Sequence, residues 1–332
     1  MAARVLRGRS ASTRVLVAGV IAGAVTFGLL AQLLNQSLLS LATTILLYVV
    51  LVQGWNVLGG YVGYLNLGIA AFFGVGSYTV GMLWYHLGWP PFASAAVAGI
   101  VAVGVALLLA APTLRLRGAY FAIMTLIVTF IVQTIALNWP ATQGAIGIFL
   151  TPPTSDPRLN ETIFFVIYLA LATLLTIGVL VMERSRFGDA LRAIREDEDA
   201  ASIIGINTTR LKVIAFVVGA GFAGVVGGIQ GYRLSYVEPT GAFDLGLSIN
   251  VVVMAVLGGA GSWIGPLIGA PVVLALAELF RVAVTHVEVF GQSLPIELNR
   301  LALGTIIVLL ALFAPRGVVG IFQRVRGRSL GV

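Results

Sequence analysis

The residue types that could perform chemistry are few in this sequence, and their spacing excludes the common catalytic arrangements. There are no cysteines, so disulfides, thiol catalysis and cysteine-bound metals are excluded. The single lysine, Lys212, follows Leu211, whereas a phosphate-binding loop needs its lysine directly after a glycine. The two histidines, His86 and His286, lie far apart in the sequence and are not accompanied by a nucleophile. We therefore predict that this chain is not an enzyme and carries no catalytic residue, metal or cofactor.

A few polar side chains in or beside apolar segments are candidates for a translocation path. These are Asn56, Tyr64, Asn66, Gln133 and Asn250. Any one of them alone more often bonds a neighbouring helix. As a set, the weakly polar residues inside spans suit the passage of a small polar solute better than a proton-driven pump, which usually needs a buried carboxylate. This set comprises Gln53, Asn56, Asn66, Gln133 and Asn250.

The densest group of charges lies between Glu183 and Lys212, in the stretch ERSRFGDALRAIREDEDAASIIGINTTRLK. Within it, Phe187, Leu191 and Ile194 recur at helical spacing. This spacing predicts a short amphipathic helix over residues 187–195.

A second short helix is predicted to follow the first, over Ala200–Ile204. Asp197 or Asp199 is placed to cap its start, and Gly205 to end it in a left-handed conformation. Two such helices form a platform for a protein partner, although a solvated basic loop would also explain the arginines. The residues predicted to form this docking surface are Phe187, Gly188, Leu191, Arg192, Arg195, Asp197, Asp199, Ala200, Ala201 and Gly205.

The composition around these segments is that of an integral membrane protein. Hydrophobic residues make up 59% of the 332 and charged residues 10%, with a mean hydropathy of +1.02. A soluble domain would carry about a quarter charged residues. The apolar runs are continuous and about 20 residues long, which favours membrane-spanning helices over strands. The net charge of +7 does not indicate nucleic-acid binding, because the arginines cluster at the ends of apolar runs.

Ten apolar segments predict an all-α polytopic protein with about ten spans. They lie at about 15–34, 38–58, 62–87, 91–111, 118–138, 162–182, 213–231, 244–259, 264–283 and 300–315. With both termini in the cytoplasm, sixteen of the twenty lysines and arginines lie inside, as the positive-inside rule requires.

This topology divides the chain into three parts. Residues 1–14 form a cytoplasmic tail, 15–315 a transmembrane domain that contains the cytoplasmic loop 183–212, and 316–332 a basic cytoplasmic tail. The apolar run that begins at Val15 is longer than that of a usual signal peptide and is followed by no clear cleavage site, so we interpret it as a retained span.

Glycine is frequent, with 40 residues, and is concentrated in two stretches, Gly54–Tyr78 and Leu257–Gly269. Such stretches permit close helix packing, and they also permit broken helices where protein supplies hydrogen-bond partners. Their similar placement in two halves of the chain suggests a pathway at the membrane midplane built from an internal repeat.

Four stretches of the sequence resemble the LivM-type permease subunit of branched-chain amino acid ABC importers. They are Asn56–Thr79, Leu114–Leu126, Ser185–Asn207 and Val256–Ala270, and they run in register over most of residues 50–275. Asp199, Ala200, Ala201 and Gly205 match the ATPase-coupling loop of such permeases. The resemblance implies a type II importer fold and a location in the bacterial cytoplasmic (inner) membrane. It also implies a sister permease, two cytosolic ATPases that use the ATP, and an extracytoplasmic solute-binding protein.

The sequence departs from the family pattern at positions that bear on the solute. Tyr64, Asn66 and Ile69 stand where the family usually has Gln, Ser and His, and Phe130 and Gln133 where it has Glu and Arg. Urea, amides or another small organic solute therefore remain alternatives to branched-chain amino acids. A stand-alone secondary transporter or channel is the alternative from another class.

Overall fold

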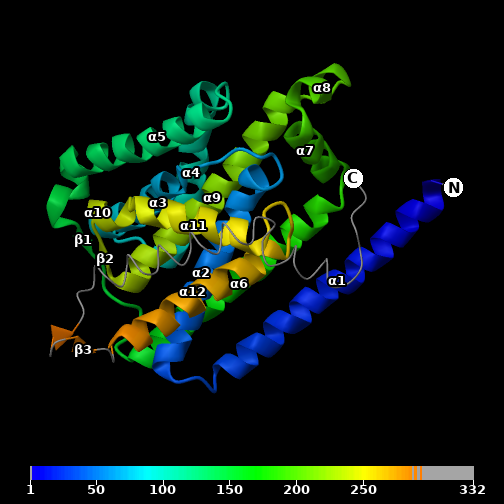
Figure 1. Ribbon diagram of the computed structural model, residues 1–332. Helices are drawn as coiled ribbons and strands as arrows, with labels where there is room; N and C mark the ends of the chain where they lie inside the picture. Colours follow the sequence, from blue (N-terminus) through cyan, green and yellow to red (C-terminus); the bar gives the residue numbers. More distant parts are fainter. Residues whose placement is uncertain (1, 286–287, 290–291, 294–332) are drawn as a thin grey trace.

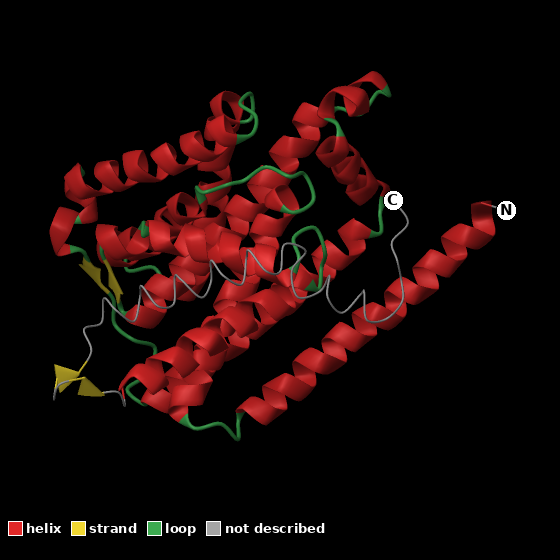
Figure 2. Cartoon of the chain, viewed as in Figure 1, coloured by secondary structure: helices red, strands yellow, loops and turns green. Residues whose placement is uncertain are grey.

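The computed structural model describes residues 2–285, 288–289 and 292–293, which form a bundle of long helices joined by short loops (Figure 1; Figure 2). The all-α, polytopic prediction is confirmed at this level. In the described part of the chain, seven helices are long and apolar enough to cross a membrane. The predicted span 300–315 and the basic tail 316–332 lie outside the described residues.

The helices and strands of the described residues are named in chain order. The α-helices are α1 (Ala2–Ala31), α2 (Gln36–Gly59), α3 (Ile69–Leu87), α4 (Pro91–Thr113), α5 (Ala119–Asn138), α6 (Pro157–Glu183), α7 (Arg186–Glu196), α8 (Glu198–Ile203), α9 (Thr208–Leu234), α10 (Pro239–Ala242), α11 (Leu245–Gly258) and α12 (Gly265–Thr285). The shorter elements are the 3₁₀ helices η1 (Pro140–Thr142) and η2 (Gly144–Ile146) and the strands β1 (Ile148–Phe149), β2 (Tyr236–Val237), β3 (Glu288–Val289) and β4 (Gln292–Ser293).

One predicted boundary differs from the structure. The segment predicted as a span over 62–87 becomes helical only at Ile69, because Gly60–Gly68 forms a loop in which Gly63 has φ +86°. Helix α1 begins at Ala2, and its apolar span covers Thr13–Ala31, so the predicted tail 1–14 is helical for most of its length.

Helix α9 lies at the centre of the bundle and packs along α2, α3 and α4. Glycines allow this close approach: a Cβ added to Gly227 would overlap the backbone carbonyl of Phe73 on α3. Lipid tails offer no hydrophobic drive to bring helices together, so close van der Waals packing of small residues has to do so. The centre of the bundle therefore depends on backbone contact more than on large side chains.

At the end of the bundle away from α7 and α8, polar contacts hold the helices in place. The guanidinium of Arg233, near the end of α9, lies 2.7 Å from a carboxylate oxygen of Glu161 on α6. It also donates to the hydroxyl of Ser40 on α2, at 3.0 Å. Strands β1 and β2 pair antiparallel at this end and join the loop after α5 to the segment after α9 (Figure 1).

Helix α1 lies at the edge of the bundle, and its main contact in the described structure is with α6 (Figure 1). Arg184, just after α6, donates to the hydroxyl of Thr13 on α1 at 3.3 Å. The first turns of α1 therefore lie at the same end of the bundle as α7 and α8, which follow α6 directly.

Candidate functional site

The first element of the candidate site is α7, the predicted amphipathic helix. The Ser185 hydroxyl caps it by accepting from the amide of Gly188, and Gly188 is buried against the backbone at the end of α6. Leu191 and Ile194 are fully buried, and Phe187 is half-buried against the core. The apolar face predicted from the helical spacing is confirmed, and it packs on the bundle.

The second element is α8, which follows α7 without a linker. Asp197 caps it: a carboxylate oxygen of Asp197 accepts from the amides of Asp199 and Ala200, both at 2.9 Å. Gly205 ends the helix with φ +88°, a conformation in which other residues are strained, and the amide of Ile206 returns to the carbonyl of Ala201. The predicted helix is confirmed, although it begins at Glu198, two residues earlier than expected.

A polar cluster beneath α8 connects it to three other parts of the bundle. We define the cluster as Tyr64, Arg117, Glu198, Asp199 and Lys212. The ammonium group of Lys212, on α9, lies 2.6 Å from one carboxylate oxygen of Glu198, and the Tyr64 hydroxyl donates to the other at 2.6 Å. Arg117, between α4 and α5, forms two hydrogen bonds to Asp199, at 2.8 and 3.1 Å.

The charges in the polar cluster stabilise one another. Burial alone would raise the pKa of Glu198, but hydrogen bonds from Lys212 and Tyr64 and the charges of Lys212 and Arg117 hold that pKa below its ordinary value. Hydrogen bonds from Arg117 and its charge lower the pKa of Asp199. Both carboxylates are therefore ionised at neutral pH, and α8 is attached by charge-assisted hydrogen bonds.

Helix α7 and the end of α6 contact both glycine-rich breaks, Gly60–Gly68 and Gly259–Gly265. Arg195 donates to the carbonyl of Gly60 at 2.7 Å. Glu183 accepts from the Tyr61 hydroxyl at 2.5 Å and from the Trp263 amide at 3.0 Å.

Arg192, whose guanidinium lies 3.1 Å from a Glu183 oxygen, also turns toward this region. Arg192 and Arg195 were both predicted to belong to the docking surface for a partner. In the structure, each of the two side chains makes a polar contact within the bundle.

The two breaks contact each other directly. The Asn56 amide donates to the carbonyl of Ser262 at 3.0 Å, and its oxygen accepts from the Gly261 amide at 2.8 Å. The two glycine-rich stretches therefore meet in the structure, and their place at the membrane midplane stays a prediction. Both breaks lie against α7 and the end of α6, where α2 and α11 end and α3 and α12 begin.

The structure does not gather the five predicted path residues into one site. Asn56, Tyr64 and Asn66 lie near one another in and beside the first break, where Asn66 accepts from the amide of Gly68. Gln133, on α5, donates to the carbonyl of Pro239 at 3.4 Å, and Asn250 lies on α11. Two of the five therefore belong to other parts of the bundle.

The exposed surface of α8 carries residues that the sequence did not single out. Ile203 and Ile204 are 86% and 74% exposed, whereas Ala201 faces the bundle and is buried. Of the predicted Ala200–Ala201 pair, only Ala200 is exposed. Two adjacent apolar side chains at the tip of a polar segment form a surface suited to a protein partner. Two adjacent isoleucines within a charged loop were the signal in the sequence that could have identified this surface.

Within the described residues, no group of three or more His, Asp or Glu side chains could hold a metal ion. His86, at the end of α3, hydrogen-bonds the carbonyl of Ala141.

Comparison with known proteins relates this arrangement to transport. The family described as "Branched-chain amino acid transport system / permease component" matches residues 37–311. The chain is 30% identical over 314 residues to the high-affinity branched-chain amino acid transport system permease protein LivM of Salmonella typhimurium, a match that covers 86% of this chain and 71% of that protein. The Escherichia coli permease protein LivH is 31% identical over 178 residues, covering 54% of this chain and 53% of LivH. No solved structure matches the chain.

Replacing Lys212 with Met should destabilise the protein, because it removes the nearer cation of the largely buried Glu198 carboxylate and leaves only the exposed guanidinium of Arg117, at 3.6 Å. Breaking a buried pair in this way typically costs about 3–5 kcal/mol. Thermal unfolding of the detergent-purified protein would measure the loss, with the exposed Arg210→Met as the matched control. The pKa of Glu198 is lower in the folded protein than in the unfolded chain. The ion pair therefore contributes to stability above the pKa of the unfolded chain, and this contribution is lost as the pH falls through the pKa of the folded protein. Equal melting temperatures for the two variants at pH 7 would contradict this account.

Proposed function

The chain belongs to the branched-chain amino acid transport permease family, and on that premise we propose that it is the permease subunit of an ABC importer for branched-chain amino acids. With a sister permease it forms the translocation path, and separate cytosolic ATPases supply the energy. The observation that carries the proposal is the exposed surface of α8, with Ile203 and Ile204 at its tip. ATP hydrolysis by partners is consistent with Lys212, the single lysine, being held in an ion pair with Glu198.

We propose that α7 and α8 are the contact with an ATPase subunit. Ile203 and Ile204 insert into an apolar groove on that partner, and the surrounding charges set the orientation. Buried apolar side chains at the centre of an interface supply most of its binding energy, while a polar rim excludes water. The cap at Asp197 and the stop at Gly205 keep α8 short and rigid, so a push on it is transmitted rather than absorbed.

The polar cluster then transmits the movement of α8 to the helices of the bundle. Glu198 connects α8 to α9 through Lys212 and to the first break through Tyr64. Asp199 connects α8 to the α4–α5 loop through Arg117. Rigid-body reorientation of helices is a common form of alternating access, and these contacts give it a route.

We propose that Asn56, Tyr64 and Asn66 close the inner end of the path and do not bind the solute. Their hydrogen-bonding groups are already engaged with protein, as the Asn56 contacts to Gly261 and Ser262 illustrate. A cavity of about 320 Å³ at the opposite end of the bundle, lined in part by Ser77, Gln230 and Glu238, is the proposed outer opening. Gln133 and Asn250 remain candidates for the path between the two ends.

The assembly we propose has ten spans per permease with both termini in the cytoplasm of a bacterial cell, in its inner membrane. The hydrogen bond between Arg184 and Thr13 supports part of this topology, since it brings the start of α1 to the α7 end. The further partners are two ATPases and an extracytoplasmic binding protein.

Two alternatives differ in solute or in class. An importer of urea or amides would share every contact described above, and uptake of labelled leucine against labelled urea distinguishes the two. A stand-alone secondary transporter would move solute in proteoliposomes that contain only this chain and an ion gradient. We expect no uptake there, because no buried unpaired carboxylate is found in the described spans to couple to protons.

Replacing Ile203 and Ile204 together with Glu should abolish co-purification of the ATPase and reduce uptake at least tenfold, since two carboxylates would be buried in an apolar groove. Both side chains are exposed, so the variant should still insert and fold. Thr209→Glu, at the exposed start of α9, is the charge-matched control. Affinity purification from the native membrane measures the first effect. Unchanged ATPase recovery with the Ile203/Ile204 variant would refute the docking role of α8.

The absence of cysteine makes the proposed path testable by single-cysteine labelling. Glu238→Cys should react with a membrane-impermeant maleimide from the outside, because Glu238 lines the outer cavity. Asn56→Cys should stay unreactive in the resting state, because Asn56 is fully buried. Labelling of both positions at the same rate would contradict the closed inner end.

A further inference from the structure

A cavity away from the proposed path lies between α1 and the junction of α6 and α7. It has a volume of about 670 Å³. We call it the α1 groove and define it by the residues that line it. These are Thr13, Arg14, Val17, Ala18, Ile21, Val181, Arg184, Ser185, Arg186 and Asp189.

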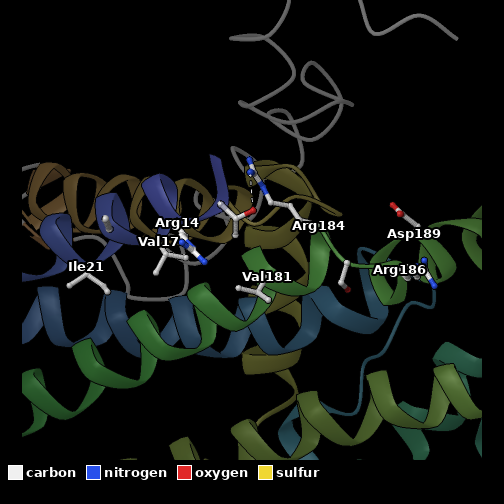
Figure 3. A pocket seen from close by; sticks show the side chains of 10 residues that line it. Arg14, Val17, Ile21, Val181, Arg184, Arg186 and Asp189 are labelled. Carbon is white, nitrogen blue, oxygen red and sulfur yellow. Dashed lines mark hydrogen bonds between the residues drawn. The ribbon is translucent and has the colours of Figure 1, made fainter. Parts of the chain in front are cut away.

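The α1 groove has an apolar floor and a basic rim. Figure 3 shows Val17 and Ile21 on α1 near Val181 on α6, with Arg14 and Arg184 beside them. Ile21 is 46% exposed and Val181 48%, so the floor is open to whatever fills the groove. In a bilayer, that floor would contact hydrocarbon.

Charge distinguishes this groove from an ordinary lipid-facing surface. Three guanidinium groups line it, from Arg14, Arg184 and Arg186, against the single carboxylate of Asp189. That carboxylate also lies 3.9 Å from Arg192, outside the groove. The lining therefore has an excess of positive charge and fits an anion.

The position of the groove along the helices decides what kind of anion it fits. Arg14 directly precedes the apolar run of α1, and Arg184 directly follows the end of α6, so the rim lies where both spans leave the hydrocarbon. A molecule that contacts both rim and floor must have a charged head and an apolar tail. A free inorganic anion would leave the floor uncovered.

From this geometry we propose that the α1 groove binds an anionic phospholipid of the leaflet on the α7 side, with its phosphate at the arginine rim and an acyl chain on the floor. Basic pockets between spans on the cytoplasmic side are suited to such headgroups. The proposal does not depend on which solute is carried. Bound there, the lipid bridges α1 to Arg186 at the start of α7.

Among the described spans, α1 would gain the most stability from such a bridge. Only 6% of the apolar stretch of α1 is buried inside the described protein, and the main contact of α1 is with α6. The lipid therefore adds contact between a weakly attached helix and the segment proposed to bind the ATPase. We expect the anionic lipid to raise the melting temperature of the full chain.

The test measures lipid binding to the full chain in detergent, by native mass spectrometry and thermal unfolding. Phosphatidylglycerol should bind and stabilise, whereas phosphatidylcholine and inorganic phosphate should do neither. Each basic residue near an anionic surface contributes a factor of about five in affinity, so Arg14→Gln with Arg186→Gln should weaken phosphatidylglycerol binding about 25-fold.

Two further variants distinguish a specific lipid site in the α1 groove from nonspecific electrostatic attraction. Arg115→Gln removes an exposed arginine at the same end of the bundle but outside the groove, and it should leave binding unchanged. Val181→Phe fills the floor without altering charge, and it should weaken binding several-fold. An equal loss with Arg115→Gln, full binding by Val181→Phe, or equal binding of phosphatidylcholine or phosphate would overturn the proposal.

Discussion

The structure depends on satisfying backbone hydrogen bonds where the chain breaks between apolar helices. Lipid offers no donors or acceptors, so each break must find its partners within the protein. Here Asn56, in the last turn of α2, bonds the backbone of the second break, and Arg195 and Glu183 bond both breaks from α7 and the end of α6. Further partners come from nearby side chains, such as the Thr125 hydroxyl that accepts from the amide of Leu67. The helices that end at the breaks are therefore fixed to α7 and to the end of α6.

Many of the charged side chains between Glu183 and Lys212 are engaged by other parts of the protein. Arg192 and Arg195 turn inward, and Glu198 is held between Lys212 and Tyr64. Ionic contacts that span several elements can change between discrete arrangements. Under the proposed function, these contacts would connect α8 to the bundle, and Ile203 and Ile204 would supply the partner-binding surface.

Local rules predicted much of the structure of α7 and α8 from the sequence. The cap at Asp197, the left-handed Gly205 and the apolar stripe of α7 each follow from residue type and spacing over one or two turns. The start of α3 at Ile69 was missed, because Gly60–Gly68 is apolar enough to read as a span. The contacts of Asn56 and Arg195 join residues far apart in sequence, and no local pattern specifies them.

The exposed face of α8 shows how one long-range contact decides what local rules leave open. The six-residue helix Glu198–Ile203, with Ile204 as its C-cap residue, does not specify its inner face by hydrophobicity, since that would bury the isoleucines. Residues three apart in a helix share a face, so the pairing of Glu198 with Lys212 also turns Ala201 inward. Two positions beyond Ala201, the helix has rotated by about 200°, which directs Ile203 away from the bundle. Ile204 lies beyond the last helical residue, where this face rule no longer applies, and it is 74% exposed. The ion pair of a largely buried carboxylate thus determines that α8 presents Ile203 outward.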